Sequence, residues 1–236
     1  MKLKGEIEMS KIKDDIQEVL SVLNDGDTIL VGGFGLVGAP LTLIEGLIEK
    51  DIKDLTIVSN NLGESGKGLG AVLNQGKISK GIGSYFTSNR DVGDAYQRGE
   101  IELELRPQGT LSEAMRAGGA GIPAFYTPTA QGTDLAKGKE EREFDGEKYI
   151  LEKAIRGNVA FVRAQKADKL GNLVYYKTGR NFNPIMATAA DYVIAEVDEI
   201  VEVGEIDPEA VVTPHLYVDA IVVAEQILTK DGVQNV

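Results

Sequence analysis

The pattern of hydrophobic and polar positions predicts alternating helices and short buried strands over the first sixty residues. Apolar residues recur at helical spacing from Ile12 to Leu23, and an Asn-Asp-Gly turn ends that stretch. An apolar run at Thr28–Val31 then leads through a glycine-rich loop to an amphipathic stretch at 41–50 and a second apolar run at 55–58. Strand, helix and strand in this order are typical of a parallel sheet covered by helices. We therefore expect an α/β fold.

Shorter elements are predicted in the remainder of the chain. Region 118–139 lacks a regular pattern but contains apolar side chains, so we expect an ordered loop that lines a site. Hairpins are predicted at Asp145-Gly146 and between 159–166 and 173–177. Helices are predicted at 71–75, 91–98 and 110–117, the last with Thr110 as N-cap, and strands at 78–85, 101–105 and 192–197. Because no repeat, linker or composition shift is seen, we expect a single domain over 1–236, a largely parallel sheet flanked by helices with extra hairpins.

Composition narrows the classes of function. The chain has 236 residues, 42% of them hydrophobic, and a formal net charge of −12, which argues against binding to a nucleic-acid backbone. It contains no cysteine, which excludes a disulfide framework, a thiolate nucleophile and a zinc–thiolate site. Residues 1–6 lead into charged sequence and do not resemble a signal region, and the longest uncharged run, 28–44, holds four glycines and a proline. We expect a cytoplasmic protein without a membrane span.

The glycine-rich loop after the first strand is the strongest candidate for a binding site. Glycines let backbone N–H groups approach a ligand closely, and Pro40 suits the first turn of the following helix. The start of that helix favours a phosphate or an oxyanion. Residues 33–38 also fit G-x-G-x-x-G, the dinucleotide fingerprint, but the second strand ends in Ser59-Asn60-Asn61 and not in the acid that holds a ribose. A nicotinamide or flavin site therefore remains an alternative.

A longer pattern extends beyond the loop. The segment from Asp25 to Pro40 resembles the signature of family I CoA-transferases, and the resemblance continues through 59–61, 104–111, 117–129 and 180–183. It covers roughly residues 10 to 225 and is strongest to the A (alpha) subunits of the 3-oxoacid branch. The resemblance implies an enzyme that moves CoA from an acyl-CoA, such as succinyl-CoA or acetyl-CoA, to a 3-oxoacid such as acetoacetate. Coenzyme A would be a substrate, with no cofactor bound permanently.

The resemblance also implies roles for individual residues. Asn60, Asn61 and Gln108 would bind substrate. CoA would be bound by the glycine loop, Gly32, Gly33, Phe34, Gly35, Leu36, Val37 and Gly38. Each segment has a plainer alternative: a tight strand-to-helix turn, a turn that bonds its own backbone, or a surface glutamine at a helix start.

The family's nucleophile is a glutamate in a Ser-Glu-Asn-Gly motif on the B subunit, and this motif is absent here. We interpret Glu64, in Gly63-Glu64-Ser65-Gly66, as a solvated loop acid. The resemblance thus implies no catalytic residue in this chain and a partner B subunit, in a heterodimer or heterotetramer.

Other polar residues give weaker signals. His215, the only histidine, is interpreted as a packed or surface residue. We expect no metal site, because metal binding needs clustered ligands. Glu196, Asp198, Glu199, Glu202 and Glu205 are interpreted as a solvated face of a strand. Besides an NAD(P)-dependent oxidoreductase, a non-catalytic sensor of acyl-CoA or sugar phosphates remains an alternative.

Overall fold

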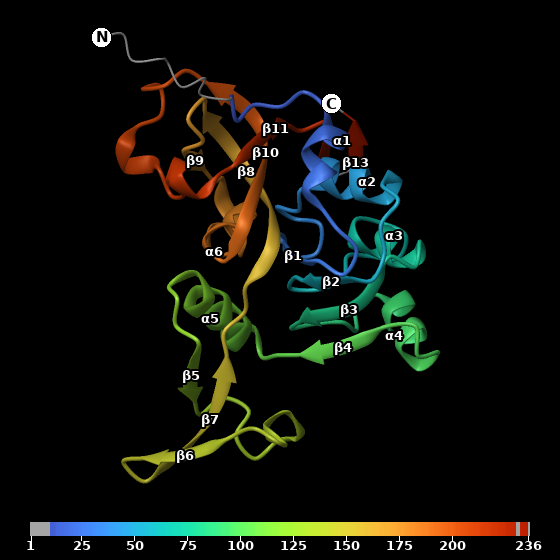
Figure 1. The fold of residues 1–236 in the computed structure, drawn as a ribbon, viewed down its shortest axis with the longest axis vertical. Coiled ribbons are helices and arrows are strands. Elements are labelled where there is room, and N and C mark those ends of the chain that lie inside the picture. The colour runs from blue at the N-terminus through green and yellow to red at the C-terminus, as the bar shows by residue number, and fades with distance from the viewer. Residues whose placement is uncertain (1–9, 230–231, 236) are drawn as a thin grey trace, which may run out of the picture.

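A computed structural model describes residues 10–229 and 232–235, and the charged start at 1–6 lies outside them. A mostly parallel, eight-stranded sheet forms the centre of the described part (Figure 1). Its strand order is β11-β10-β8-β1-β2-β3-β4, all parallel, and β9 pairs antiparallel with β8. The bounds are β1 Thr28–Val31, β2 Leu55–Val58, β3 Ile78–Gly83, β4 Glu102–Leu105, β8 Gly157–Asp168, β9 Leu173–Val174, β10 Ala190–Val201 and β11 Ala220–Val223. The expected α/β class is confirmed.

Helices cover both faces of the sheet. Ile29 and Val31 of β1 belong to one apolar cluster, together with residues of α2, α3 and α4. Leu30, between them, belongs to a second cluster with residues of α5 and α6. Alternate side chains of a strand point to opposite faces, so a strand covered on both sides is apolar throughout. The helices are α1 Ile16–Val19, α2 Leu41–Glu49, α3 Leu69–Asn74, α4 Arg90–Gln97, α5 Gln108–Gly119 and α6 Asn183–Thr188, with the 3-10 turn η1 Leu20–Val22 after α1.

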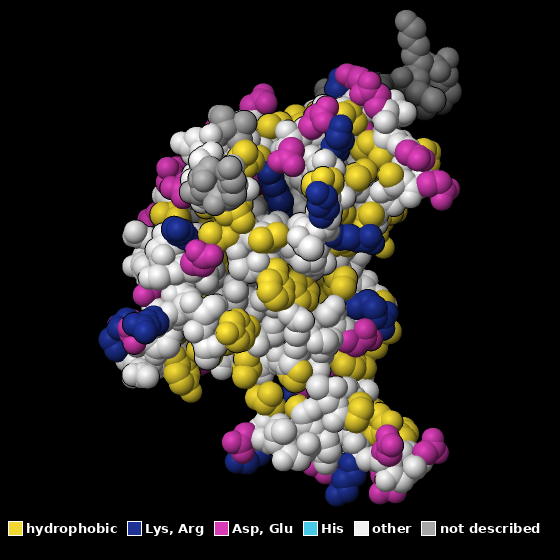
Figure 2. Space-filling view, turned by 180° about the vertical axis from the view of Figure 1, so that it is seen from behind, with side chains coloured by type: hydrophobic (Ala, Val, Ile, Leu, Met, Phe, Trp, Pro, Cys, Tyr) yellow, Lys and Arg dark blue, Asp and Glu magenta, His cyan; other side chains and the backbone are white. Residues whose placement is uncertain are grey.

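An antiparallel arm of three strands stands away from the main sheet (Figures 1 and 2). Its order is β5-β7-β6, with β5 Ala124–Thr127, β6 Glu141–Phe144 and β7 Glu147–Lys153. The expectation of irregular structure over 118–139 was wrong in part, because β5 and the 3-10 turn η2 Asp134–Ala136 lie within it. The hairpin at Asp145-Gly146 is confirmed, with positive φ angles of 52° and 83°.

The remaining elements differ from the sequence pattern at their ends. The helix expected from Thr110 begins at Gln108, directly after Pro107, so Thr110 is buried inside α5 and caps nothing. A hairpin of β12 Gln226–Thr229 and β13 Gly232–Asn235, which the pattern did not predict, contacts α2. The other 3-10 turns are η3 Lys177–Arg180, η4 Pro208–Ala210 and η5 His215–Tyr217. No helix within the described ranges is long and apolar enough to cross a membrane.

Candidate functional site

The glycine loop lies where the strand order of the main sheet reverses. The chain runs outward from β1 through β2 and β3 to β4, then returns to place β8 on the other side of β1. Ligands of open α/β sheets bind at such a reversal, beyond the carboxyl ends of the strands. Residues 32–38 follow β1 at this point and lead into α2. The position of the loop therefore agrees with a binding role.

The loop is a miniature hairpin with only a few unused donors. The N–H and C=O groups of Phe34 and Val37 bond to each other, at 2.9 and 3.2 Å, so both side chains flank the tip and are exposed. Gly35 and Gly38 have φ angles of +60° and +66°, which favour glycine. Among bonds within the described residues, the backbone N–H groups of Gly35, Leu36 and Gly38 have no acceptor. Those three groups are what the loop can offer to an anionic ligand.

Two asparagines from the segment before and within α6 hold the loop in place. Asn181 accepts from the N–H of Gly33, at 3.1 Å, and donates to the carbonyl of Val37, at 3.0 Å. Asn183 donates to the carbonyl of Gly38, at 3.0 Å, and is fully buried. A Cβ atom on Gly32 would lie 1.8 Å from the Oδ1 atom of Asn183, so this glycine makes room for the amide. No role for these asparagines was predicted, although they lie in the Arg-Asn-Phe-Asn block of the resemblance.

A second loop after β2 repeats the geometry of the first one. Glu64 and Lys67 exchange backbone hydrogen bonds, at 3.3 and 3.0 Å, as Phe34 and Val37 do one strand away. The two loops touch, because a Cβ atom on Gly68 would lie 2.9 Å from the side chain of Leu36. This structural repeat was not predicted, because its sequence shares little beyond glycines. Glu64 lies at the exposed tip, as expected of a solvated acid.

An amide cluster lies beside the glycine loop at the carboxyl edge of the sheet. Asn60 is buried, and its Oδ1 atom accepts from Nε2 of Gln108, at 3.0 Å, and from the hydroxyl of Ser84, at 2.8 Å. Two donors on the oxygen fix the direction of the Asn60 amide, so its Nδ2 atom is presented for a further acceptor. Ser59 donates to the carbonyl of Val31, at 2.8 Å, which joins this cluster to the end of β1.

Of the other predicted substrate-binding residues, Asn61 has a local contact. Its Oδ1 atom accepts from the N–H of Gly63, at 3.2 Å, so it shapes the second loop. Gln108 is exposed and uses one of its donors on Asn60. The structure therefore brings Asn60 and Gln108 into contact, and their role in substrate binding stays a prediction. At the end of β2, where a nicotinamide site would need a carboxylate, it places a buried amide.

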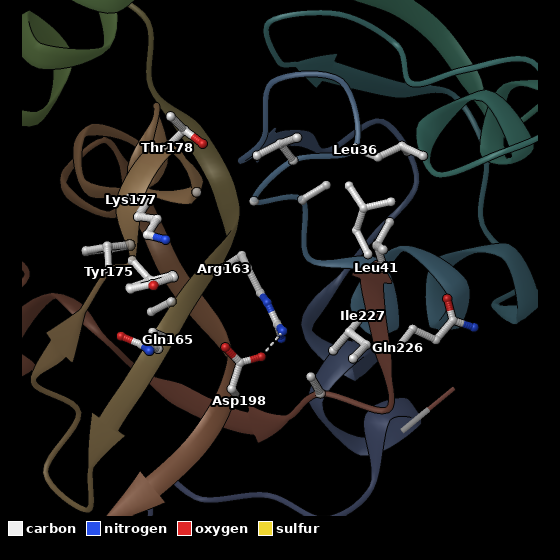
Figure 3. A pocket seen from close by; sticks show the side chains of 18 of the residues that line it. Leu36, Leu41, Arg163, Gln165, Tyr175, Lys177, Thr178, Asp198, Gln226 and Ile227 are labelled. Atoms are coloured by element: carbon white, nitrogen blue, oxygen red, sulfur yellow. Dashed lines mark hydrogen bonds and ion pairs between the residues drawn. The ribbon is translucent and has the colours of Figure 1, made fainter. Parts of the chain in front are cut away.

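A cavity of about 670 Å³ flanks the glycine loop (Figure 3). Leu36, Leu41 and Ile227 form part of its apolar wall, and Arg163 and Lys177 bring positive charge to it. Asn60 and Gln108 do not line this cavity, so the amide cluster and the cavity are separate features near the glycine loop. Lys177 and Asn181 have positive φ angles of 48° and 22°, and such strained backbone clusters at ligand sites.

One acid near this cavity is not solvated, contrary to the sequence interpretation. Glu196 is fully buried in β10 and pairs with Arg163, whose Nη1 atom lies 3.0 Å from Oε1. Burial raises the pKa of the Glu196 carboxyl to about 7, although Arg163 and the N–H of Leu43 act in the opposite direction. The middle of β10, from Val193 to Val197, is buried on both faces of the sheet, and this explains the error. Asp198 and Glu199 lie beyond that buried part and are exposed, as the sequence interpretation has them.

The other polar residues considered from the sequence form no cluster with the glycine loop within the part of the chain that the structure describes. His215 is exposed, as the sequence interpretation allowed. Within residues 10–229 and 232–235, no group of three or more His, Cys, Asp and Glu side chains could hold a metal ion. Lys and Arg side chains are interspersed with Asp and Glu on the face shown in Figure 2. The glycine loops and the amide cluster are therefore the best-defined candidate site.

Fold and site together define an α/β protein that presents neutral hydrogen-bond donors at a strand-order reversal. The sequence model of one family, described as Coenzyme A transferase, matches residues 13–224. The chain belongs to this coenzyme A transferase family.

Relatives and solved structures agree with this assignment. The chain is 53% identical over 218 residues to the A subunit of the succinyl-CoA:3-ketoacid coenzyme A transferase of Helicobacter pylori, covering 92% of this chain and 94% of the relative. It is 46% identical over 216 residues to the A subunit of the 3-oxoadipate CoA-transferase of Pseudomonas putida, covering 91% and 94%. An acyl-CoA transferase from Escherichia coli O157:H7, solved as a thioester complex with CoA, shares the fold, with a TM-score of 0.83 and 22% identity. The match covers 96% of this chain but only 50% of that one.

Proposed function

We propose that this chain is the A subunit of a CoA-transferase that moves CoA from an acyl-CoA, such as succinyl-CoA or acetyl-CoA, to a 3-oxoacid such as acetoacetate. The observation that carries the proposal is the contact between Asn60 and Gln108 beside a loop with three unused N–H groups. Such neutral donors bind carboxylate and thioester oxygens without adding a formal charge. The identity to the A subunits of two such enzymes, over nearly their whole length, supports the same assignment.

The reactive carboxylate belongs to a partner B subunit in this proposal. The chain lacks the Ser-Glu-Asn-Gly motif, and Glu64 lies exposed at the tip of a loop. The E. coli acyl-CoA transferase chain is twice as long as the part that matches, which supports a second half supplied here by another polypeptide. The two subunits form a heterodimer or a heterotetramer.

The reaction would proceed through two anhydride intermediates and one glutamyl-CoA thioester. The partner's glutamate attacks the acyl-CoA carbonyl and expels the CoA thiolate, leaving an acyl-glutamyl anhydride. The thiolate attacks the glutamyl carbonyl and releases the first carboxylate, leaving a glutamyl-CoA thioester. The 3-oxoacid carboxylate then attacks that thioester and expels CoA thiolate again. Attack of the thiolate on the new anhydride gives the 3-oxoacyl-CoA and regenerates the glutamate.

The part of this chain in each step is to bind and orient. Every addition develops negative charge on a carbonyl oxygen, and a preorganised donor stabilises that charge. The Nδ2 atom of Asn60 and the free N–H groups of Gly35, Leu36 and Gly38 are such donors. Losing one well-placed donor of this kind lowers kcat by roughly 10²- to 10³-fold in enzymes studied for it. Asn61 shapes the loop beside them.

The test is co-expression with a candidate B subunit, followed by an acetoacetyl-CoA absorbance assay with and without this chain. We expect activity only when both polypeptides are present. Hydroxylamine trapping of the glutamyl thioester is expected to label the partner alone. Activity from this chain by itself, or label on Glu64, would overturn the division of labour.

The choice of acceptor is the second question for the same assay. Of the two relatives, one acts by name on a 3-ketoacid and the other on 3-oxoadipate, at 53% and 46% identity. We favour the monocarboxylic 3-oxoacid because of the higher identity. A comparison of kcat/KM for acetoacetate and 3-oxoadipate separates them, and a preference for the dicarboxylate would redirect the proposal to that acceptor.

A further inference from the structure

Glu196 is a buried carboxylate whose partners come from separate parts of the chain. Its Oε2 atom accepts from the N–H of Leu43, at 3.0 Å, in the first turn of α2. Its Oε1 atom accepts from Arg163 of β8, at 3.0 Å. Thr42 also hydrogen bonds to Glu196. The Thr42 hydroxyl accepts from the N–H groups of Glu225 and Gln226, at the start of the C-terminal hairpin. A single side chain of β10 thus fixes the start of α2.

Helix α2 has no cap of its own. Pro40 precedes it and has no side-chain hydrogen bond to the helix, so its first N–H groups need acceptors from elsewhere. A carboxylate at this end is favoured by the helix dipole as well as by the hydrogen bond. Because α2 follows Gly38 by only three residues, the carboxylate of Glu196 also sets where the glycine loop ends.

Arg163 links Glu196 to Asn183, which contacts the glycine loop directly. Its guanidinium bonds to Asp198, as Figure 3 shows, and to Glu196. Its backbone N–H donates to Oδ1 of Asn183, at 2.8 Å. Asn183 in turn donates to the carbonyl of Gly38. The contacts form a ring that runs from Gly38 through α2, Glu196, Arg163 and Asn183 back to Gly38. The loop end at Gly38 is therefore held twice, by Asn183 directly and by Glu196 through the start of α2.

Stability alone does not account for this ion pair. Taking two charges out of water costs several kcal/mol each, and well-packed apolar replacements of buried pairs are often neutral or stabilising. Burial raises the pKa of the Glu196 carboxyl to about 7, so its ionised form carries a desolvation cost that Arg163 and the N–H of Leu43 offset only in part. Since Glu196 is fully buried, it cannot touch a ligand itself.

We propose that Glu196 and Arg163 are positioning residues, which hold the glycine loop in the conformation that stabilises the transition state of CoA transfer. The expected effect on catalysis rests on the proposed function. The expected effect on the conformation of the glycine loop does not depend on any activity. Loss of either side chain opens the ring, so the loop samples conformations in which its free N–H groups no longer converge.

The test compares Glu196→Gln with Glu199→Gln, a matched control on the same strand whose carboxylate pairs with Lys166 at the surface. Both are made in the complex with the B subunit. For Glu196→Gln we expect at least tenfold faster hydrogen exchange in a peptide covering 32–41, and a kcat about tenfold lower with KM changed less than threefold. The control is expected to match the wild type in both measurements.

Asp198→Asn provides a second variant, because Asp198 is half exposed and its loss leaves Glu196 in place. This substitution removes one of the two carboxylates that pair with Arg163. We expect hydrogen exchange in the 32–41 peptide to be two- to fivefold faster and kcat to be two- to fivefold lower. If Glu196→Gln fails to fold, this variant decides the question. Unchanged loop exchange in the variants that fold, or an equal effect of Glu199→Gln, would overturn the positioning role. An inactive wild-type complex would instead count against the proposed function, since loop exchange is measured without turnover.

Discussion

Gln108 donates its side-chain amide to the Oδ1 atom of Asn60, at 3.0 Å, across the carboxyl ends of two strands that are not neighbours in the sheet. The exposed glutamine therefore helps to orient the buried asparagine. Ser84 donates to the same oxygen, so Asn60 keeps its orientation if one of the two donors is lost. The pair is a preorganised donor whose direction is set before any ligand arrives.

Replacing Gln108 by alanine is expected to lower turnover without affecting assembly. The variant loses one donor to Asn60 and one direct contact, so we expect kcat to fall roughly tenfold to hundredfold. The measurement is the acetoacetyl-CoA assay on the two-subunit complex, with subunit stoichiometry checked by size-exclusion chromatography. Gln97→Ala, at the exposed end of α4, is the control. Turnover equal to that of the control would remove the assigned role.

Two glycine substitutions are expected to have effects of opposite sign. A Cβ atom on Gly32 would lie 1.8 Å from the amide oxygen of Asn183, so Gly32→Ala must displace a buried side chain. Overpacking of this kind typically costs about 1–3 kcal/mol. Gly93 lies in α4 with open space at its Cβ position, so Gly93→Ala is expected to raise the free energy of unfolding by about 0.5–1 kcal/mol.

Urea unfolding of the chain measures both effects. The Gly32→Ala variant is also expected to show faster hydrogen exchange near Gly38, whose carbonyl Asn183 holds. A variant at Gly32 as stable as the wild type would mean that the loop and α6 are not packed as the structure shows.

Much of the fold follows from the sequence because the strands are covered on both faces. Strands β1 and β2 were predicted with the bounds that the structure has, since continuous apolar runs such as Thr28–Val31 have no other favourable place. The glycine loop, Asn60 and Gln108 were identified through the resemblance, and the structure adds that the last two touch. Their roles in binding stay predictions.

Other features depend on contacts that a linear pattern does not carry. The acid at 196 occupies the same alternating stretch as the exposed Asp198, and only the partner Arg163, which lies 33 residues earlier, makes it a buried ion pair. The tethers from Asn181 and Asn183 likewise reach back across 144 residues or more to the glycine loop. Strand β5 was missed because the strand it pairs with among the described residues, β7, lies more than twenty residues further on.

Glu196 is expected to make stability depend on pH near neutrality. Burial raises the pKa of its carboxyl to about 7, against about 4.3 in an unfolded chain. Between these values the folded state binds more protons than the unfolded state, so this group's contribution to the free energy of unfolding falls as pH rises. Above about pH 7 the contribution is constant.

Urea unfolding of the wild type and of Glu196→Gln at pH 5 and pH 8 isolates this effect. The free energy of unfolding of the variant is subtracted from that of the wild type at each pH. This cancels the contributions of carboxyls that both proteins share, such as Asp168, whose lowered pKa means that its stabilising contribution is lost only at lower pH. We expect the stability of the wild type relative to the variant to be lower at pH 8 than at pH 5. A difference that does not change between the two conditions would show that Glu196 stays in one protonation state.

Arg106 is expected to hold the arm to the main sheet. Its guanidinium bonds to Glu104 at the end of β4, at 2.7 Å, and to the carbonyl of Lys153 in β7, at 2.9 Å. It also lies 3.8 Å from the buried carboxylate of Glu152. Removing it leaves Glu152 with Lys139 as its remaining cation. Because this second cation stays, we expect Arg106→Met to cost about 1–3 kcal/mol, less than the complete loss of a buried pair.

The matched control is Arg98→Met, because Arg98 also pairs with a glutamate two residues away but does so at the surface. Surface pairs contribute little, so we expect no measurable change in stability for the control. Hydrogen exchange gives the local readout, and the arm, β5 to β7, is expected to exchange faster in Arg106→Met while β1 and β2 stay protected. Equal effects of the two substitutions would mean that Arg106 does not join the arm to the sheet. Since Arg106 lies two residues before Gln108, a loosened arm is also expected to lower turnover in the two-subunit complex.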